Sequence, residues 1–319
     1  MKIVYSYVIP IYNEEEVFPL LQAELIRFLS AFPKPGGVEV VLVDDGSYDH
    51  SWDLMKALAS QDSRFVAVRL SRNFGHQFAL TAGYEHARGE VIICLDADLQ
   101  DPPEVTLKMI DEWEKGADVV YGVRSIRLGE SRFKLWTAEL FYWIFSKFSN
   151  VEVPRNCGDF RLLSRRALNA FLQFKERHRY LRGLVGWVGF KTTTVSYERQ
   201  PRAAGQTKYP LVKMLKLGAD GIVSMSFTPL RISYVIALLI LCITLGYLFY
   251  NIVLHFFYEV TMVPGWTSLM LLIMIFGFFN LIALGIMGEY VGRIYEEVKR
   301  RPNFIISDVI RDGSAHGEK

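Results

Sequence analysis

The stretch VIICLDADLQDPPE, Val91 to Glu104, joins five apolar residues to three aspartates, Asp96, Asp98 and Asp101, and then to two prolines. A short apolar run of this kind is typical of a buried strand. Asp96, Asp98 and Gln100 alternate along the chain, so in an extended backbone their side chains point the same way. Neighbouring carboxylates repel unless a cation lies between them, which favours a hard divalent ion, Mg²⁺ or Mn²⁺. We assign Asp101 and the prolines to the next helix start; solvated carboxylates there are the simpler alternative.

The N-terminal part of the chain alternates between two hydrophobic periods. Apolar runs predict strands, and segments with helical spacing follow most of them. The predicted strands are Ile3–Ile9, Val38–Val43, Phe65–Leu70, Val91–Leu95 and Asp118–Tyr121. Near-continuous Val, Ile and Leu strands alternating with helices predict an α/β fold, with an open, doubly wound parallel sheet in its first half.

Polar clusters follow four of these strands, namely PIYNEEE (10–16), DDGS (44–47), SRNFGHQ (71–77) and DADLQ (96–100). Open parallel sheets bind ligands beyond the carboxyl ends of their strands, so we expect one shared site. Asn13 and Glu16 resemble a capping box at the first helix start. Asp44 is suited to bind a nucleobase or ribose, and Gly75 allows a sugar or phosphate to approach. Each turn alone is also typical of an ordinary strand-to-helix connection.

Two long stretches, Ile232–Tyr258 and Val260–Gly288, contain no Asp, Glu, Lys or Arg. Each is long enough to cross roughly 30 Å of hydrocarbon as a helix, which predicts two membrane spans rather than two buried core helices. Basic residues flank the outer ends of the pair: Lys208, Lys213, Lys216 and Arg231 before it, and Arg293, Lys299, Arg300 and Arg301 after it. The positive-inside rule therefore predicts that both termini and the soluble part are cytoplasmic.

Basic residues also gather before the aromatic segment LWTAELFYWIFSKF (135–148), which we expect to lie at a membrane surface or a subunit contact. They are Arg124, Arg127, Arg132 and Lys134. Guanidinium groups suit phosphate, and a basic face attracted to anionic headgroups is the alternative. We expect a soluble domain over 1–208, interfacial helices over 209–230, spans within 231–293 (about 232–257 and 265–288), and a cytoplasmic tail over 294–319.

The remaining composition indicates little. A net charge of +2 over 319 residues gives no sign of a nucleic-acid partner. Cys94, Cys157 and Cys242 are assigned to a strand, a loop and a span, without the spacing of a disulfide framework or zinc site. The N-terminal residues predict a strand and no signal peptide, and we expect disorder over the last ten or so residues.

Seven motifs occur in a fixed order: PIYNEEE, VDDGS, NFGHQ, DADLQDPPE, CGDFRLLSRRAL, RYLRGLVGWVGF and PRAAGQTKY. From Ile3 to about Pro302 the chain resembles the family 2 inverting glycosyltransferases, which have a Rossmann-like GT-A domain. Within them it is most similar to polyprenyl-phosphate sugar transferases of the bacterial bactoprenol (undecaprenyl-phosphate) glucosyltransferase type. Dolichyl-phosphate mannose synthases are more distant relatives.

The resemblance implies roles for individual residues. A sugar-nucleotide donor is held by Pro10, Tyr12, Glu14, Asp44, Asp45, Asn73, Gly75, Asp96, Ala97, Arg202 and Lys208. Asp96, Asp98 and Gln100 hold Mg²⁺ or Mn²⁺ with the diphosphate, and Asp159 is the catalytic carboxylate on the acceptor side. Arg124, Arg127, Arg132 and Lys134 are our candidates for the acceptor phosphate, since an anionic lipid needs cations near the membrane.

Two positions depart from the family pattern. His76 stands where relatives often carry lysine, and Asn156 stands where many carry aspartate, which leaves Asp159 as the sole carboxylate of its motif. A lipid phosphate, with a second pKa of about 6, is mostly an anion and does not obviously need a base. Our hypothesis is therefore that Asp159 orients the acceptor or the Arg161 region; a structural salt bridge with Arg161 or Arg165 is the alternative.

These observations predict a metal-dependent hexosyltransferase in the bacterial plasma membrane. Its expected substrates are a nucleotide sugar, most simply UDP-glucose, and undecaprenyl phosphate, and its product is a lipid-linked sugar for glycan modification. A mannose synthase using GDP-mannose is the alternative. A processive polysaccharide synthase fits less well, because the sequence lacks a QxxRW motif and further spans. Gly277, Gly285 and Gly288 permit close helix contact, so we expect a homo-oligomer.

Overall fold

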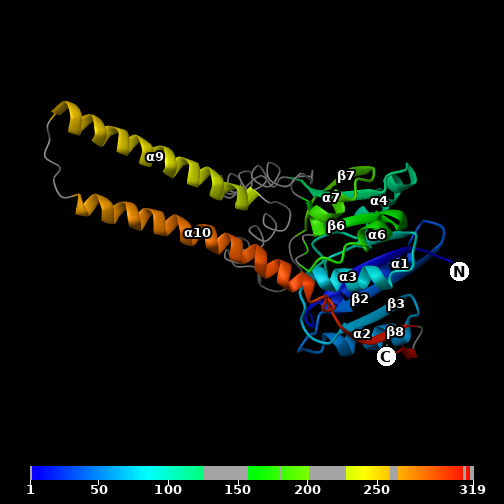
Figure 1. The fold of residues 1–319 in the computed structure, drawn as a ribbon. Coiled ribbons are helices and arrows are strands. Elements are labelled where there is room, and N and C mark those ends of the chain that lie inside the picture. The colour runs from blue at the N-terminus through cyan, green and yellow to red at the C-terminus, as the bar shows by residue number, and fades with distance from the viewer. Residues whose placement is uncertain are drawn as a thin grey trace. The chain divides into compact units, whose positions relative to one another are not determined.

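The computed structural model describes residues 2–125, 157–177, 179, 181–200, 228–258, 265–311 and 314–316. The chain divides into two compact units, Met1–Gly221 with Pro302–Lys319, and Ile222–Arg301. The first unit contains a sheet with helices on both faces, and the second contains two long helices (Figure 1). The segment predicted as a membrane-surface helix (135–148) lies outside the described residues, as do residues 209–227 of the predicted interfacial helices (209–230); residues 228–230 begin a long helix.

The described residues form a nine-stranded sheet in the order β7-β5-β6-β4-β1-β2-β3-β8-β9 (Figure 1). Its strands are β1 Ile3–Ile11, β2 Gly37–Asp44, β3 Phe65–Leu70, β4 Val91–Cys94, β5 Val119–Arg124, β6 Cys157–Ser164, β7 Thr192–Tyr197, β8 Ile306–Arg311 and β9 Ser314–His316. β1 pairs in parallel with β2 and β4, and β2 pairs in parallel with β3. The doubly wound half is therefore confirmed.

The other half of the sheet is mixed. β6 lies between β4 and β5 and runs antiparallel to both, so the fifth predicted strand is confirmed but is not the neighbour of the fourth. Cys157 is the first residue of β6, not part of a loop as the sequence suggested. Cys94, Cys157 and Cys242 are all free.

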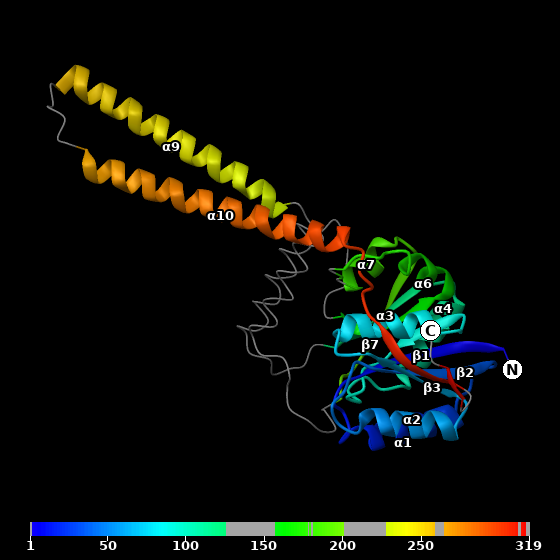
Figure 2. The same ribbon diagram turned by 60° about the horizontal axis from the view of Figure 1, so that its bottom comes forward.

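Helices cover both faces of the sheet (Figure 2). They are α1 Phe18–Ser30, α2 Ser51–Gln61, α3 His76–His86, α4 Val105–Glu114, α6 Arg165–Phe171 and α7 Leu181–Trp187. Leu25 of α1, Met55 of α2 and Met109 of α4 join one hydrophobic core. α3 packs on the opposite face, where Tyr84 contacts Phe171 of α6 with 5.9 Å between ring centroids. Burial of each large apolar side chain contributes about 1.5–3 kcal/mol.

The capping box predicted at Asn13 and Glu16 is wrong. Helix α1 begins at Phe18, and the residue before it, Val17, makes no side-chain cap. Asn13 adopts a left-handed conformation with a φ of 52°, and its Oδ1 accepts a hydrogen bond from the N–H of Tyr48 at 2.9 Å. The polar side chain therefore connects two loops instead of starting the helix.

The C-terminal residues belong to the sheet, which the sequence did not predict. β8 pairs antiparallel with β3, and β9 pairs with β8, so the expected disorder is wrong for residues 310–311 and 314–316. A buried ion pair holds β8 in place. Arg311 Nη1 lies 2.9 Å from Glu39 Oε2, and Arg311 Nη2 donates to the carbonyl of His86 at 2.8 Å. Glu39 also accepts a hydrogen bond from Ser6 at 2.6 Å.

Arg311→Met is expected to lower the free energy of unfolding by about 3–5 kcal/mol, because it leaves the buried Glu39 carboxylate without its partner. The double variant Glu39→Gln/Arg311→Met should recover most of that loss, since both charges are removed together. Denaturant unfolding in detergent measures both variants. A single variant as stable as the wild type would show that the pair does not hold β8.

The second unit consists of α9 Thr228–Tyr258 and α10 Trp266–Val298. Among the described residues, Leu272–Val298 is the one stretch that is long and apolar enough to cross a membrane, with a mean hydropathy of 2.0. α9 contains a shorter apolar stretch, Val235–Tyr247. The second predicted span is thus matched by a candidate helix, and the pair of spans stays a prediction.

Candidate active site

Loops from four adjacent parallel strands meet at one edge of the sheet. Tyr12 follows β1, Asp45 follows β2, Asn73 follows β3 and Asp96 follows β4. Because these strands pair in parallel, their carboxyl ends share that edge. The predicted convergence of the polar loops is therefore confirmed. Two of the candidate donor-binding residues, Pro10 in β1 and Ala97, are buried.

Hydrogen bonds join the loop after β1 to the loop after β2. Ser47 Oγ accepts from the N–H of Asn13 at 3.0 Å, and Ser51 Oγ accepts from the N–H of Glu14 at 2.9 Å. The rings of Tyr12 and Tyr48 meet edge to face, with 6.4 Å between centroids. Tyr12 and Glu14, two of the candidate donor ligands, therefore stand on a fixed backbone.

Asp44 and Asp45 are both buried and bonded within the protein. Asp44 accepts from the N–H of Ser47 at 3.0 Å and lies 3.3 Å from Arg69 Nε. Asp45 accepts from the N–H of Phe74 at 2.8 Å and from the N–H of the next residue at 2.9 Å. Burial raises the pKa of both carboxyls. In this structure Asp44 holds its own loop through Ser47, and Asp45 holds the loop that carries Asn73. Their contact with a donor stays a prediction.

The chain turns directly after Asp96, so the extended backbone expected for Asp96, Asp98 and Gln100 is wrong. Leu99 adopts a left-handed conformation with a φ of 55°. Asp98 Oδ1 accepts from the N–H of Gln100 at 3.2 Å. The Gln100 side chain is buried, and its Nε2 donates to the carbonyl of Gln200 at 3.2 Å. The turn, not side-chain alternation, keeps Asp96 and Asp98 in one loop.

Asp101 does not cap the following helix. Helix α4 begins at Val105, and the preceding Glu104 makes no side-chain cap. Asp101 is only 2% exposed and accepts a hydrogen bond from the hydroxyl of Tyr197 at 2.5 Å. Burial and the neighbouring Asp96 raise the pKa of Asp101 to about 6. The residue connects the loop after β4 to strand β7.

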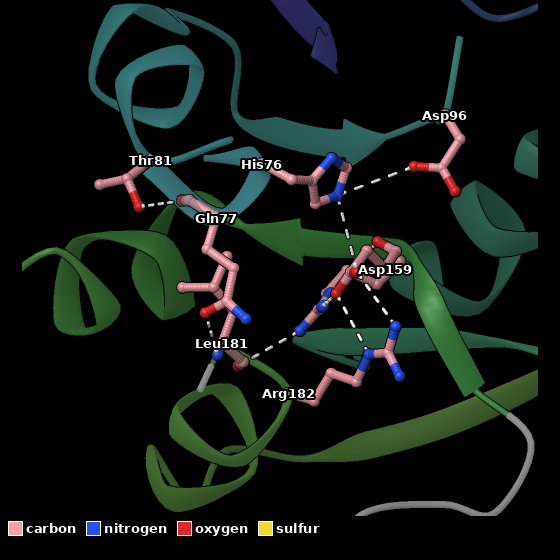
Figure 3. Close-up of polar contacts among 8 residues, drawn as sticks. His76, Gln77, Thr81, Asp96, Asp159, Leu181 and Arg182 are labelled. Atoms are coloured by element: carbon pink, nitrogen blue, oxygen red, sulfur yellow. Dashed lines mark hydrogen bonds and ion pairs between the residues drawn. The ribbon is translucent and has the colours of Figure 1, made fainter. Parts of the chain in front are cut away.

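His76 lies between Asp96 and Asp159 (Figure 3). Its Nε2 is 3.9 Å from Asp96 Oδ1 and 3.7 Å from Asp159 Oδ2. The residue before it, Gly75, has a φ of 104°, a conformation that glycine adopts without strain. Burial acts to lower the pKa of His76, but Asp159 and Asp96 outweigh burial and raise it above its ordinary value. His76 therefore lies between the two carboxylates that the sequence assigns to the donor side and the acceptor side.

Asp159 is surrounded by positive charge. Arg161 donates to its Oδ1, and Arg182 Nη2 lies 3.1 Å from its Oδ2 (Figure 3). Burial acts to raise the pKa of Asp159, but Arg182, His76 and Arg161 hold it well below its usual range. A carboxylate with so low a pKa is a weak base, which favours an orienting role. The alternative pairing with Arg161 is confirmed, whereas Arg165 donates to backbone carbonyls elsewhere.

Arg124, at the end of β5, lies against the start of β6. A Cβ at Gly158 would lie 2.7 Å from Arg124 Nη2, so a larger residue there would displace the guanidinium from its present place. Arg124 Nε is 3.4 Å from the hydroxyl of Tyr197. This candidate for the acceptor phosphate therefore lies close in space to the Asp159 motif, although it comes from a different strand. Several other candidates lie outside the described residues: Arg127, Arg132, Lys134, Asn156, Arg202 and Lys208.

Sequence reasoning missed two contributions to this site. His76 was noted only as a departure from the family pattern, and Arg182 was quoted in a motif without a role. The signal was their residue type: His76 is the ionisable residue of NFGHQ, and Arg182 is one of two arginines in RYLRGLVGWVGF. Among the described residues, no group of three or more His, Cys, Asp or Glu side chains could hold a metal ion by itself.

A mixed α/β sheet with carboxylate-bearing loops at the parallel strand ends defines a GT-A-like glycosyltransferase. The chain belongs to glycosyl transferase family 2, whose sequence profile matches residues 6–172.

Relatives match nearly the full chain. One is the uncharacterized glycosyltransferase YkcC of Bacillus subtilis, 43% identical over 95% of this chain and 93% of that protein. Another is the prophage bactoprenol glucosyl transferase homolog of Escherichia coli, 40% identical over 95% of this chain and 98% of that protein. One similar solved structure is glucosyl-3-phosphoglycerate synthase from Mycobacterium tuberculosis, in complex with Mn²⁺, UDP-glucose and phosphoglyceric acid. It is 17% identical to this chain, with a TM-score of 0.46, and the match covers 69% of this chain and 77% of that chain.

Proposed function

We propose that this chain is a membrane-bound inverting glycosyltransferase that moves glucose from UDP-glucose to undecaprenyl phosphate. The family membership and the bactoprenol glucosyl transferase name of a full-length relative support this assignment. The observation that carries it is the row of contacts Asp96, His76, Asp159 and Arg182 at the edge where parallel strands end. That row offers carboxylates for a metal-bound donor at one end and cations for an anionic acceptor at the other.

The donor is proposed to lie over the loops after β1, β2 and β3. Tyr12 supplies an aromatic ring beside Tyr48, and Glu14 and Asn73 supply polar groups on loops that internal hydrogen bonds hold in place. Aromatic rings of this kind bind nucleobases by stacking. Arg202 and Lys208 are proposed to contact the diphosphate.

A divalent cation is proposed to bind at Asp96 and Asp98, with Gln100 nearby. Burial, together with Asp159 and Asp98, raises the pKa of Asp96, so a bound cation would relieve an unfavourable cluster of carboxylates. Mg²⁺ and Mn²⁺ prefer oxygen ligands, and Mg²⁺ commonly takes one or two carboxylates plus substrate phosphates. When bound, the ion supplies positive charge that stabilises the departing nucleoside diphosphate.

Inverting transfer is a single displacement at the anomeric carbon. A phosphate oxygen of the acceptor forms a bond to C1 of glucose while the bond from C1 to the nucleotide's β-phosphate oxygen breaks, and the electron pair leaves with UDP. The acceptor phosphate, with a second pKa of about 6, already carries the attacking anion at neutral pH. The residues therefore need to orient two anions and stabilise the leaving group, and no proton has to be removed.

Two membrane helices, α9 and α10, are proposed to anchor the enzyme, with the transferase unit and both termini in the cytoplasm. The apolar stretches of these helices and the basic residues at their outer ends support this topology. An acceptor with a long polyprenyl chain resides in the bilayer, so the enzyme must work at its surface.

A panel of radiolabelled donors tests the function directly. Purified protein with Mg²⁺ or Mn²⁺ and a short polyprenyl phosphate is expected to form lipid-linked sugar from UDP-glucose at least about tenfold faster than from GDP-mannose or other UDP-hexoses. The reason is that hydrogen bonds to a few sugar hydroxyls select the donor, and a donor that cannot make them leaves polar groups of the site unpaired. Faster transfer from GDP-mannose would identify a mannose synthase. No lipid-linked product from any donor would refute the proposal.

A further inference from the structure

The side chains of Arg161, Arg182 and His76, the three cations around Asp159, differ in solvent exposure. The side chain of Arg161 is 1% exposed, whereas those of Arg182 and His76 are 29% and 34% exposed. Arg161 is enclosed in the protein, where it donates to Asp159 and, at 3.4 Å, to the carbonyl of Leu181. A ligand that enters the site can therefore reach Arg182 and His76, but it cannot reach Arg161.

We propose that Arg182 binds the phosphate of the lipid acceptor, and that Asp159 is a positioning residue that holds the Arg182 guanidinium in place. The inference rests on the proposed function, because it takes a polyprenyl phosphate as the acceptor. It adds Arg182 to the cations that the sequence assigns to that phosphate. It also means that Asp159 acts indirectly, by orienting Arg182.

Two contacts fix the orientation of Arg182. Its Nη2 lies 3.1 Å from Asp159 Oδ2, and its Nε lies 3.4 Å from Asp159 Oδ1. The carboxylate is itself held from the interior by Arg161. A planar guanidinium that is already oriented loses little freedom on binding, and its geometry matches the oxygens of a phosphate.

The helix that carries Arg182 is held as well. Helix α7 begins at Leu181, whose N–H donates to Gln77 Oε1 at 3.4 Å (Figure 3). Gln77 follows His76 in α3, and its own carbonyl accepts a hydrogen bond from Thr81 at 2.8 Å. His76 and Arg182 therefore come from two helices that contact each other directly.

Positive charge lies on both sides of the start of β6. Arg124 packs against Gly158, and Arg182 is bonded to the next residue, Asp159. Asp159 lies between Arg161 and Arg182, so these three side chains together carry one net positive charge. A phosphate that is mostly a dianion at neutral pH is attracted to such a group.

The order of contacts also suits a displacement reaction. From donor side to acceptor side it runs Asp96, His76, Asp159 and Arg182 (Figure 3). A diphosphate near Asp96 and an acceptor phosphate near Arg182 then lie on opposite sides of His76. An inverting displacement needs this separation, because the attacking oxygen bonds to one face of the anomeric carbon while the leaving oxygen departs from the opposite face.

Equilibrium binding of a short radiolabelled polyprenyl phosphate, without donor, tests the inference independently of catalysis. Arg182→Gln is expected to raise the Kd of this lipid phosphate at least about tenfold, because a charge-assisted hydrogen bond is lost. Arg182→Lys should raise the Kd by less, since lysine keeps the positive charge but lacks the two-pronged hydrogen-bond geometry of the guanidinium. Arg166→Gln is the matched control: Arg166 is a more exposed arginine paired with Asp118, and its loss should leave the Kd unchanged.

Steady-state kinetics separates binding from a structural role. Arg182→Gln should raise the KM for polyprenyl phosphate at least about tenfold while the KM for the nucleotide sugar changes by less than about threefold. The double variant Asp159→Asn/Arg182→Gln should show an acceptor KM no higher than that of Arg182→Gln, because Asp159 acts through Arg182. Unchanged lipid binding by Arg182→Gln, or strictly additive effects in the double variant, would overturn the inference. A wild-type protein that binds the lipid phosphate but transfers no sugar would refute the proposed function and leave this test intact.

Discussion

Asp96→Asn is expected to lower kcat/KM for sugar transfer by about 100- to 1,000-fold, while the protein stays as stable as the wild type at pH 7 or becomes more stable. The loss of activity follows from removing one carboxylate of the proposed metal site, whose charge stabilises the leaving diphosphate. The gain in stability follows from burial: Asp96 is inside the site beside Asp159 and Asp98, and both burial and these carboxylates raise its pKa.

The sign of the stability effect can be worked out from that pKa. An aspartate in the unfolded chain ionises near pH 4, whereas Asp96 in the folded protein ionises at a higher pH. The folded state therefore binds the proton more tightly, and the carboxylate increasingly destabilises the fold as the pH rises from the unfolded pKa to the folded pKa. An asparagine carries no such charge, so the difference in unfolding free energy should grow from about pH 4 up to the folded pKa of Asp96 and stay constant above it.

Asp118→Asn provides the contrast. Asp118 lies outside the site and is bonded to Ser164 at 2.8 Å and to Arg166 at 2.5 Å, and these partners, against the effect of burial, lower its pKa. Its variant should lose stability and keep transfer activity. Thermal unfolding and initial rates at saturating Mg²⁺ measure both variants. If Asp96→Asn keeps wild-type kcat/KM, or if its activity falls only in step with its stability, the metal role is wrong.

The parallel half of the sheet could be predicted because each strand is an almost uninterrupted apolar run. Strand β6 could not, since it carries Asp159 and Arg161 within its length, and no hydrophobic period indicates that a buried arginine belongs to a strand. Strand β8 was missed for another reason. Its antiparallel partner β3 lies far away in the sequence, and a buried ion pair between Arg311 and Glu39 holds it.

The carboxylates of the site could be predicted from local motifs, but their surroundings could not. The alternation argument for Asp96, Asp98 and Gln100 failed because the chain turns at Ala97 and Asp98 and Leu99 then takes a left-handed conformation, which no residue type in that stretch signals. Likewise, the partners of Asp159 come from other segments: His76 from the start of α3 and Arg182 from α7. Such contacts depend on how strands and helices pack, so they appear only in three dimensions.

Those contacts favour one of two proposed roles for Asp159. A general base works best when its pKa lies near the operating pH. Three cations instead hold the pKa of Asp159 well below its usual range, against the effect of burial. The same cations are stabilised by the carboxylate, and one of them, Arg161, is almost fully enclosed. The geometry therefore indicates a residue whose charge organises the acceptor side of the site.

Asp159→Asn should accordingly destabilise the protein, whereas Asp96→Asn should not. It leaves Arg161 charged, buried and without its counter-ion, so the free energy of unfolding is expected to fall by about 3–5 kcal/mol at pH 7. Because the folded pKa is depressed, the stabilisation from Asp159 is complete above the unfolded pKa near 4 and is lost as the pH falls toward the folded pKa. The difference in unfolding free energy between the variant and the wild type should therefore be constant from about pH 5 to pH 8 and become smaller at lower pH.

The pH–rate profile of Asp159→Asn then separates positioning from proton removal. If Asp159 positions Arg182, the ratio of variant to wild-type kcat/KM stays low and flat above about pH 7, where the acceptor phosphate is already a dianion. If Asp159 removed a proton, hydroxide would replace it, and the variant rate would rise with pH toward the wild-type rate. Initial rates from pH 6 to pH 9 at fixed metal concentration distinguish the two, and a variant that regains the wild-type rate at high pH would exclude positioning as the main role. Retained binding of UDP by the variant confirms that the measured loss does not come from unfolding.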